Sequence, residues 1–141
     1  QFLDLGCQLV RTAALDDDDE GAGQRQQQHD AGQQTQIRVQ LSNSLLAVFS
    51  QTLCQRTNPA PGQFGRVMAQ EILINTPATA NLIREGKTAQ LYSQIQTGGS
   101  FGMQTLERAL ANLVEGGSVS QAEALSKTGK PEELLRLLGQ I

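Results

Sequence analysis

Residue types that commonly mark catalytic, metal-binding or secreted proteins are scarce in this chain of 141 residues. It has no tryptophan, one histidine and two cysteines, and aromatic residues make up 4% of it. A core without many large aromatic side chains must be built mainly from Leu, Ile, Val and Ala, which favours helices over a β-sandwich. The composition therefore predicts one mainly helical domain with a modest core.

The scarcity of histidine and cysteine argues against nucleophilic and metal-dependent chemistry. His29 is the only histidine, and no second histidine or cysteine lies at metal-ligand spacing from it. A serine or cysteine nucleophile needs a positioned base, and the sequence offers none. Cys7 and Cys54 could form one disulfide, but two cysteines without a secretory signal fit a reducing compartment better. A small enzyme with an unrecognised site is the weakest hypothesis, since no titratable residues cluster.

Concentrated positive charge and long apolar runs are also missing. The formal net charge is −3, and the 11 lysines and arginines are scattered singly. A general nucleic-acid binder needs a clustered basic surface, so we expect no nucleic-acid partner. No run approaches the roughly 18 apolar residues needed to span a bilayer, and the first residues carry no basic leader. We therefore expect a cytoplasmic chain that does not span the membrane.

The N-terminal part is acidic and rich in glutamine and glycine. Between Asp16 and Gly32 it has no apolar residue except alanine, so nothing offsets the entropy of ordering and we expect disorder there. Its acidic run lacks the alternating oxygen ligands and distal glutamate of a calcium loop. We interpret it as a solvated tail with no metal site.

A regular pattern begins at Gln33. Two β-compatible runs, Thr52–Arg56 and Arg66–Asn75, are separated by a stretch with two prolines and two glycines, which predicts a β-hairpin. Before them, apolar residues recur on one helical face and predict a helix that ends near Ser50. The residues on this face are Ile37, Leu41, Leu45, Val48 and Phe49.

Start and stop signals divide the C-terminal half into about five short helices. Thr76 and Pro77 form an N-cap and a first-turn proline, and Gly86 supplies the stop of the first helix. We expect Thr88 to cap the second helix, which the glycine pair after Thr97 ends. Such short helices are unstable alone and must pack together.

The ends of the remaining three helices are also predicted from start and stop signals. The third is expected to run from about Gly102 to Glu115, and Ser120 with Glu123 has the spacing of a capping box for the fourth. Pro131 opens the last helix. The predicted fold class is α+β, mainly α: one amphipathic helix, a short hairpin and a bundle of about five short helices.

The phosphate-binding motif G-x-x-x-x-G-K-[ST] is absent. In that motif backbone amides and a lysine hold phosphates at a turn from a strand into a helix. Glu85–Thr88 reads E-G-K-T, but it lacks the first glycine and separates two predicted helices. We expect no cofactor to be bound by this chain alone.

Four blocks between Gln36 and Gln104 carry a family resemblance. They read Q-I-R-V-Q-L-S-N-S-L-L-A-V-F-S-Q-T-L, F-G-R-V-M-A-Q-E-I-L-I-N-T-P, N-L-I-R-E-G-K-T and I-Q-T-G-G-S-F-G-M-Q-T. In this order they resemble the C-terminal part of the type IV pilus retraction ATPases, the twitching-motility motors of the type II/IV secretion ATPase superfamily. The resemblance covers roughly residues 33–139.

The resemblance implies an organisation and a set of partners. Residues 1–34 would be an unrelated or disordered tail, 35–75 the last helix and hairpin of a RecA-like core, and 76–141 a helical C-terminal domain. Complete family members are hexameric rings that use ATP and magnesium, lie peripheral to the inner membrane at the pilus base, and contact base proteins there. The P-loop and acidic boxes of the family should lie upstream and cannot be placed on this chain, so we expect it to be inactive alone.

The resemblance also implies two sites. T-P-A-T-A-N-L-I-R-E-G-K is similar to the family's A-I-R-N-L-I-R-E helix, which couples nucleotide state to pilus retraction, although Thr79 and Ala80 depart from Ile and Arg. Arg66 corresponds to an arginine towards the nucleotide side of the motor and is a candidate contact to nucleotide or a neighbouring subunit; a strand-end cation holding a carboxylate is the alternative. The matching residues of the helix are Ala78, Asn81, Leu82, Ile83, Arg84 and Glu85.

Two functional hypotheses follow. The chain is either a C-terminal fragment of a retraction motor, carrying its coupling and output helices, or a stand-alone helical binding module that docks on a full-length motor. The residues alone also permit a plain amphipathic helix at the signature, burying Leu82 and Ile83. In a complete motor the helix from Ile37 to Phe49 would pack on the RecA-like sheet, so we expect its apolar face to be exposed here and to favour self-association.

Overall fold

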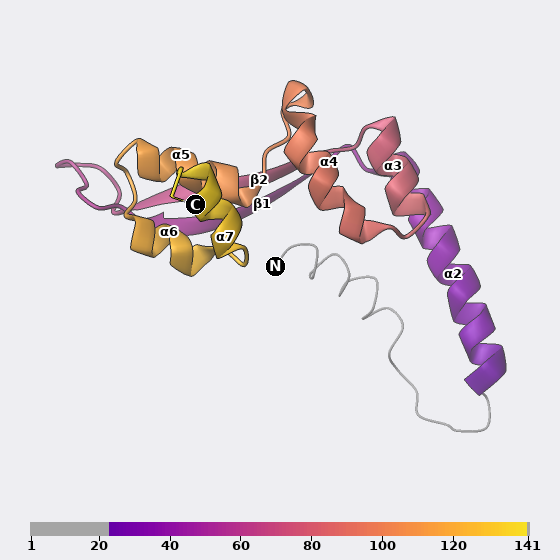
Figure 1. Cartoon of the computed structure of the whole chain (residues 1–141). Helices are drawn as coiled ribbons and strands as arrows, with labels where there is room; N and C mark the ends of the chain where they lie inside the picture. Colours follow the sequence, from indigo (N-terminus) through magenta and orange to yellow (C-terminus); the bar gives the residue numbers. More distant parts are fainter. Residues whose placement is uncertain (1–22, 141) are drawn as a thin grey trace. The chain divides into compact units, whose positions relative to one another are not determined.

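A computed structural model of the chain describes residues 23–140, with side chains described from residue 32. These residues divide into two compact units (Figure 1). The first unit contains the described residues of Gln1–Leu46 together with Asn75–Gln94, and the second contains those of Ala47–Ile74 and Ile95–Ile141. The predicted divisions at residues 34 and 75 stay predictions.

The first unit is helical. Helix α2 (Gly23–Ser44) packs against helix α3 (Pro77–Arg84), which is followed by the 3-10 turn η1 (Thr88–Gln90) and the start of α4 (Leu91–Thr97). Thr76 caps α3 as predicted, since its hydroxyl accepts a hydrogen bond from the amide of Thr79 at 3.3 Å. Thr88 is not a cap, because it lies within the 3-10 turn that leads into α4.

Helix α2 differs from the sequence prediction at both ends. It begins at Gly23, within the stretch expected to be disordered, and the earlier part of that stretch lies outside the described residues. Glutamine and arginine have good helix propensity, and no proline interrupts the segment. The intrinsic preference of these residues therefore supports a helix, although the segment has no pattern of apolar residues. The predicted end near Ser50 is wrong: the helix stops at Ser44, where the Ser42 and Ser44 hydroxyls donate to carbonyls of the preceding turn.

The second unit is built on an antiparallel hairpin. Strand β1 (Ala47–Gln55) pairs with β2 (Arg66–Ile74) in a regular register, so the predicted hairpin is confirmed. Val48 and Phe49 belong to β1 rather than to the preceding helix, because β-branched and aromatic side chains suit a strand that finds a partner. The outer edge of β2 is bridged at Ile72 by Gln104.

Helices cover one face of this hairpin (Figure 1). Cys54 and Ala69 lie on that face and are buried in a core with Leu110 and Leu134. The opposite face exposes Phe49, whose side chain and backbone are 62% accessible. The elements that follow the hairpin in this unit are the end of α4, the 3-10 turn η2 (Gly98–Phe101), α5 (Leu106–Glu115), α6 (Gln121–Lys127) and α7 (Pro131–Leu137).

The helix boundaries of the second unit mostly follow the sequence signals. Ser120 caps α6 and Pro131 opens α7, as predicted. The third predicted helix starts later than expected, at Leu106 with Thr105 as its N-cap. Met103 lies before this helix and is nevertheless buried, because it packs in a core cluster with Leu73 and Ile95. The predicted α+β class with about five short helices after the hairpin is confirmed.

The structure describes no helix that is both long and apolar enough to cross a bilayer. The apolar face expected on the helix from Ile37 is partly exposed, with Ile37 at 44% and Leu41 at 38% accessibility.

Gly86 offers a test of the left-handed turn that follows α3. Its φ is +70°, and a Cβ built there would lie 2.9 Å from Nη1 of Arg38. We predict that Gly86→Ala lowers the free energy of unfolding by about 1–2 kcal/mol, mainly because L residues disfavour this backbone conformation. Gly99→Ala is the matched control, since nothing lies within 4 Å of its added Cβ. Urea unfolding of both variants checks this, and equal stabilities would contradict it.

Candidate functional site

The signature helix is α3, and it presents a buried and an exposed face. Ile83 and Thr79 are buried, with 8% and 0% of their surface accessible. Ala78 and Asn81 are exposed, as are Arg84 and the C-cap residue Glu85 that follows the helix. Leu82 is half-buried. The structure therefore buries Ile83 of the signature and leaves its polar residues accessible.

The polar face is held together by a short chain of interactions. Asn81 Nδ2 donates to Glu85 Oε1 at 2.8 Å, while Arg84 Nη1 donates to Asn81 Oδ1 at 3.4 Å. Lys87 Nζ adds an ion pair with Glu85 Oε2 at 2.7 Å. Hydrogen bonds from Lys87 and Asn81 lower the pKa of Glu85, so its carboxylate stays charged. Asn81 thus connects a cation and an anion on one exposed surface.

Two adjacent residues, Asn75 and Thr76, fix where α3 begins. Asn75 Nδ2 donates to the carbonyl oxygens of Ser42 at 3.0 Å and Leu45 at 2.7 Å, at the end of α2. Its backbone amide donates to the Leu46 carbonyl at 2.9 Å. Thr76 caps α3, so two neighbouring side chains provide hydrogen bonds to the carbonyl groups at the end of α2 and to an amide at the start of α3. Sequence reasoning missed Asn75, for which the only signal was a side-chain amide directly before an N-cap.

Arg66, the other predicted site residue, belongs to the second unit. It is exposed at the first position of β2, opposite Gln55 in the register. No ion pair with it is found among the described residues, so the alternative of a cation holding a carboxylate gains no support from them. The structure does not bring Arg66 and the signature helix together within one unit.

Two carboxyl groups meet at the first turn of α5. Glu71, on the helix-covered face of β2, is half-buried and accepts a hydrogen bond from the amide of Leu106. Burial raises the pKa of Glu71, and the nearby Glu107 carboxylate raises it further. Glu107 is itself buried and accepts a hydrogen bond from Thr128 Oγ1 at 2.7 Å. No group of three or more metal-ligating side chains is found in the described part of the chain.

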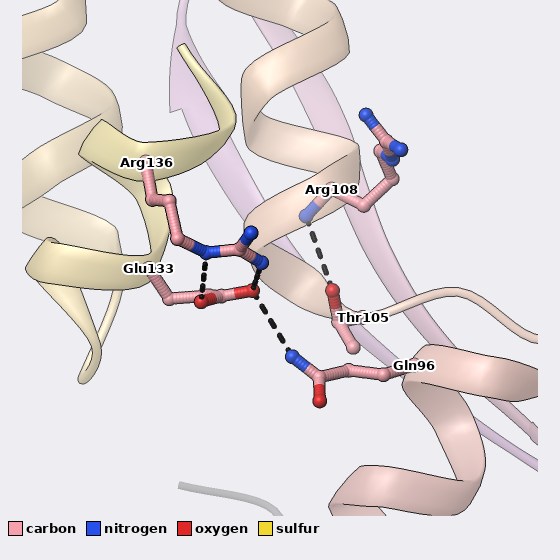
Figure 2. Close-up of polar contacts among 5 residues, drawn as sticks. All are labelled: Gln96, Thr105, Arg108, Glu133 and Arg136. Carbon is pink, nitrogen blue, oxygen red and sulfur yellow. Dashed lines mark hydrogen bonds and ion pairs between the residues drawn. The ribbon is translucent and has the colours of Figure 1, made fainter. Parts of the chain in front are cut away.

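A second polar cluster joins α4 to α7 (Figure 2). Arg136 donates to both carboxylate oxygens of Glu133, at 3.0 and 2.7 Å, and Gln96 Nε2 donates to the same carboxylate at 3.0 Å. The Arg136 hydrogen bonds lower the pKa of Glu133. Figure 2 shows the guanidinium of Arg108 pointing away from this cluster. With its carboxylate fully occupied, the cluster is suited to holding helices in place.

Comparison with known proteins identifies relatives of most of this chain. Over 102 residues the chain is 50% identical to the type IV pilus retractation ATPase PilT of Pseudomonas aeruginosa, which covers 72% of this chain and 28% of that protein. A twitching motility protein of Neisseria gonorrhoeae is 40% identical over 104 residues, covering 74% of this chain and 27% of the relative. No family model matches the chain.

The fold agrees with the sequence. A crystal structure of the pilus retraction motor PilT with bound ADP matches with a TM-score of 0.62 and 38% identity, over 74% of this chain and 27% of that one. The matched segment is the counterpart of the C-terminal portion of a PilT-type retraction ATPase. The resemblance predicted from the four sequence blocks is thereby confirmed, and the chain spans 27–28% of the length of these relatives.

The two departures from the family signature occupy different environments in α3. Thr79 is fully buried, and its hydroxyl lies 3.1 Å from that of Thr76, so its polar atom has a partner inside the unit. Ala80 is half-buried. Thr79 therefore holds a core position with a satisfied hydroxyl, and Ala80 places no charge on the helix.

The raised pKa of Glu71 leads to a pH prediction. A carboxyl whose pKa is raised in the folded state stabilises the fold below its ordinary pKa, and this contribution is lost as pH rises through the folded pKa. Glu71→Gln removes that titration, so the variant should lose less stability than the parent between about pH 4 and pH 7. Urea unfolding over this range measures it.

Glu85→Gln is the control, because the pH dependence expected from Glu85 is opposite to that expected from Glu71. The pKa of Glu85 is lowered, so its contribution is present above the ordinary carboxyl pKa and lost as pH falls. A Glu71→Gln variant whose stability follows the same pH dependence as the parent would show that burial does not penalise this carboxylate.

Proposed function

We propose that this chain forms the output end of a type IV pilus retraction motor. In this account α3 and the polar surface centred on Asn81 pass a change in nucleotide state to the rest of a hexameric, cytoplasmic motor at the pilus base. ATP and magnesium are bound by other parts of the complete motor. The inner-membrane proteins of the pilus base are the partners that receive the output.

The exposed polar face of α3 carries the proposal. Arg84 and Glu85 are held by Asn81, and all three are accessible although the same helix buries Ile83. Exposed charges contribute little to stability, so an ordered set of them beside a buried apolar face favours a role in contact with another surface. The relatives that share this segment are named as retraction and twitching motility proteins, which supports the same role here.

A chimeric motor tests this role. The counterpart segment of P. aeruginosa PilT is replaced by this chain's matched segment, and twitching is scored in a strain that lacks the native gene. We predict that the chimera supports twitching. Asn81→Ala in the chimera should abolish twitching while ATP turnover of the purified ring changes by no more than about twofold, because the helix lies outside the nucleotide motifs.

The matched control is Gln90→Ala, which removes an exposed amide from η1 without touching the Asn81 network. It should leave twitching intact. If Asn81→Ala twitches like the parent chimera, the polar face of α3 is not part of the output. If the parent chimera fails while the isolated chain joins full-length motors in native mass spectra, the docking module is the better description.

The isolated chain is predicted to hydrolyse no ATP. It has no complete G-x-x-x-x-G-K-[ST] motif, since the E-G-K-T of Glu85–Thr88 lacks the first glycine and separates two helices. Magnesium-dependent turnover is measured at high protein concentration with full-length PilT as the positive control. Turnover that copurifies with the chain and resists removal of contaminating ATPases would contradict the proposal.

A further inference from the structure

Asn75 attaches the start of α3 to the end of α2 through backbone carbonyl groups. Its side-chain Nδ2 donates to the carbonyl oxygens of Ser42 at 3.0 Å and Leu45 at 2.7 Å. Its own backbone amide donates to the carbonyl oxygen of Leu46 at 2.9 Å. These acceptors lie at the C-terminal end of α2 or directly after it, whereas the next residue, Thr76, is the N-cap of α3. One residue therefore ties the ends of two helices together.

The acceptors of Asn75 fix the orientation of its side-chain amide. Both partners of Nδ2 are carbonyl oxygens, which cannot donate, so a reversed amide would place Oδ1 against two acceptors. Oδ1 itself is buried, and no described residue donates a hydrogen bond to it. Toward the end of α2 the side chain of Asn75 therefore acts as a donor, and an isosteric carboxylate could not replace it.

The other end of α3 is also close to α2. Gly86 lies in the turn after α3 with a φ of +70°, and an added Cβ there would lie 2.9 Å from Nη1 of Arg38 on α2. The lack of a side chain at Gly86 thus allows Arg38 to approach this turn closely. Within the first unit, α2 and the residues directly after it contact both ends of α3 and pack against it (Figure 1).

The attachment at Asn75 is partly buried, in contrast to the polar face of α3. Ser42, whose carbonyl oxygen is one of the acceptors, is only 3% accessible. A hydrogen bond is stronger in such surroundings than in water, and a buried carbonyl oxygen that loses its donor costs free energy. The hydrogen bonds of Asn81 are exposed. Helix α3 therefore has a firm attachment to α2 and a separate accessible surface.

We infer that Asn75 is a positioning residue of the output: it makes α3 move together with the end of α2, so that a displacement of α2 reaches the polar face centred on Asn81. This inference rests on the proposed function of α3, which requires an input from nucleotide-binding parts outside this chain. Among the described elements α2 packs most extensively against α3, so the input arrives through α2. Packed helices joined by hydrogen bonds can carry such coupling.

The distance between nitroxide labels on α2 and α3 tests the attachment in the full chain. The labels are placed at Gln40→Cys and Ala78→Cys, which are exposed positions on the two helices. Cys7 is replaced by serine, and Cys54 is buried. If α2 holds α3 in one position, the parent chain gives a single narrow distribution of distances.

Asn75→Asp keeps the shape of the side chain but places a carboxylate against the carbonyl oxygens. It should broaden the distance distribution while circular dichroism shows unchanged helix content, because Thr76 still caps α3. The matched control is Asn43→Asp, which puts the same charge near the C-terminal end of α2, where the helix dipole also disfavours it. The Asn43 side chain is exposed and takes no part in the attachment, so this variant should keep the narrow distribution.

Twitching of the chimeric motor tests the role in output. Asn75→Asp should abolish twitching while ATP turnover of the purified ring stays within about twofold of the parent chimera, and Asn43→Asp should twitch like the parent. If the parent chimera does not twitch, the proposed function fails and the output role of Asn75 fails with it. The label distances then still decide separately whether Asn75 attaches α3 to α2.

Several outcomes would overturn the inference while the parent chimera twitches. These are a narrow distance distribution in Asn75→Asp, an Asn75→Asp chimera that twitches like the parent, and equal effects of Asn43→Asp. If the Asn75→Asp ring does not assemble, Asn75→Ala, which removes the donors without adding charge, is judged by the same criteria. Failure of both rings to assemble also overturns the inference, because Asn75 would then serve folding and not coupling.

Discussion

The register of the β1–β2 hairpin is the constraint on which the second unit depends. It sends Cys54 and Ala69 to one face, where Leu110 and Leu134 complete a fully buried core. A slip of one residue would turn that set outward and bring Phe49 and Leu53 inward. The bridge from Gln104 holds β2 from its other side, so β2 is hydrogen-bonded along both of its edges.

The first unit depends instead on hydrogen bonds made by the adjacent residues Asn75 and Thr76. One satisfies the carbonyl end of α2 and the other the amide end of α3, so the signature helix starts at a defined point. With its apolar side fixed by Thr79 and Ile83, the helix presents Asn81 in a set orientation. An ordered, accessible polar surface on an anchored helix is what the proposed coupling role of α3 requires.

Local signals predicted much of this fold, and tertiary contacts decided the rest. Caps at Thr76 and Ser120 could be read from the sequence because the capping residue and its amide partner are three positions apart. The strand around Val48 could not be predicted in this way, because the spacing of its apolar residues also suits a helix and it becomes a strand by pairing with β2. The signature residues were identified by resemblance, whereas the role of Asn75 rests on contacts with residues 30 and 33 positions away.

The hydrogen-exchange rates of individual backbone amides test most directly whether the hairpin is the frame of the second unit. The account predicts that the slowest amides lie in β2, with Ile72 among them, and in the buried part of α5 around Leu110. Exchange of the β2 amides that is fast while α5, α6 and α7 remain protected would contradict it, because the helices would then be stable without the hairpin.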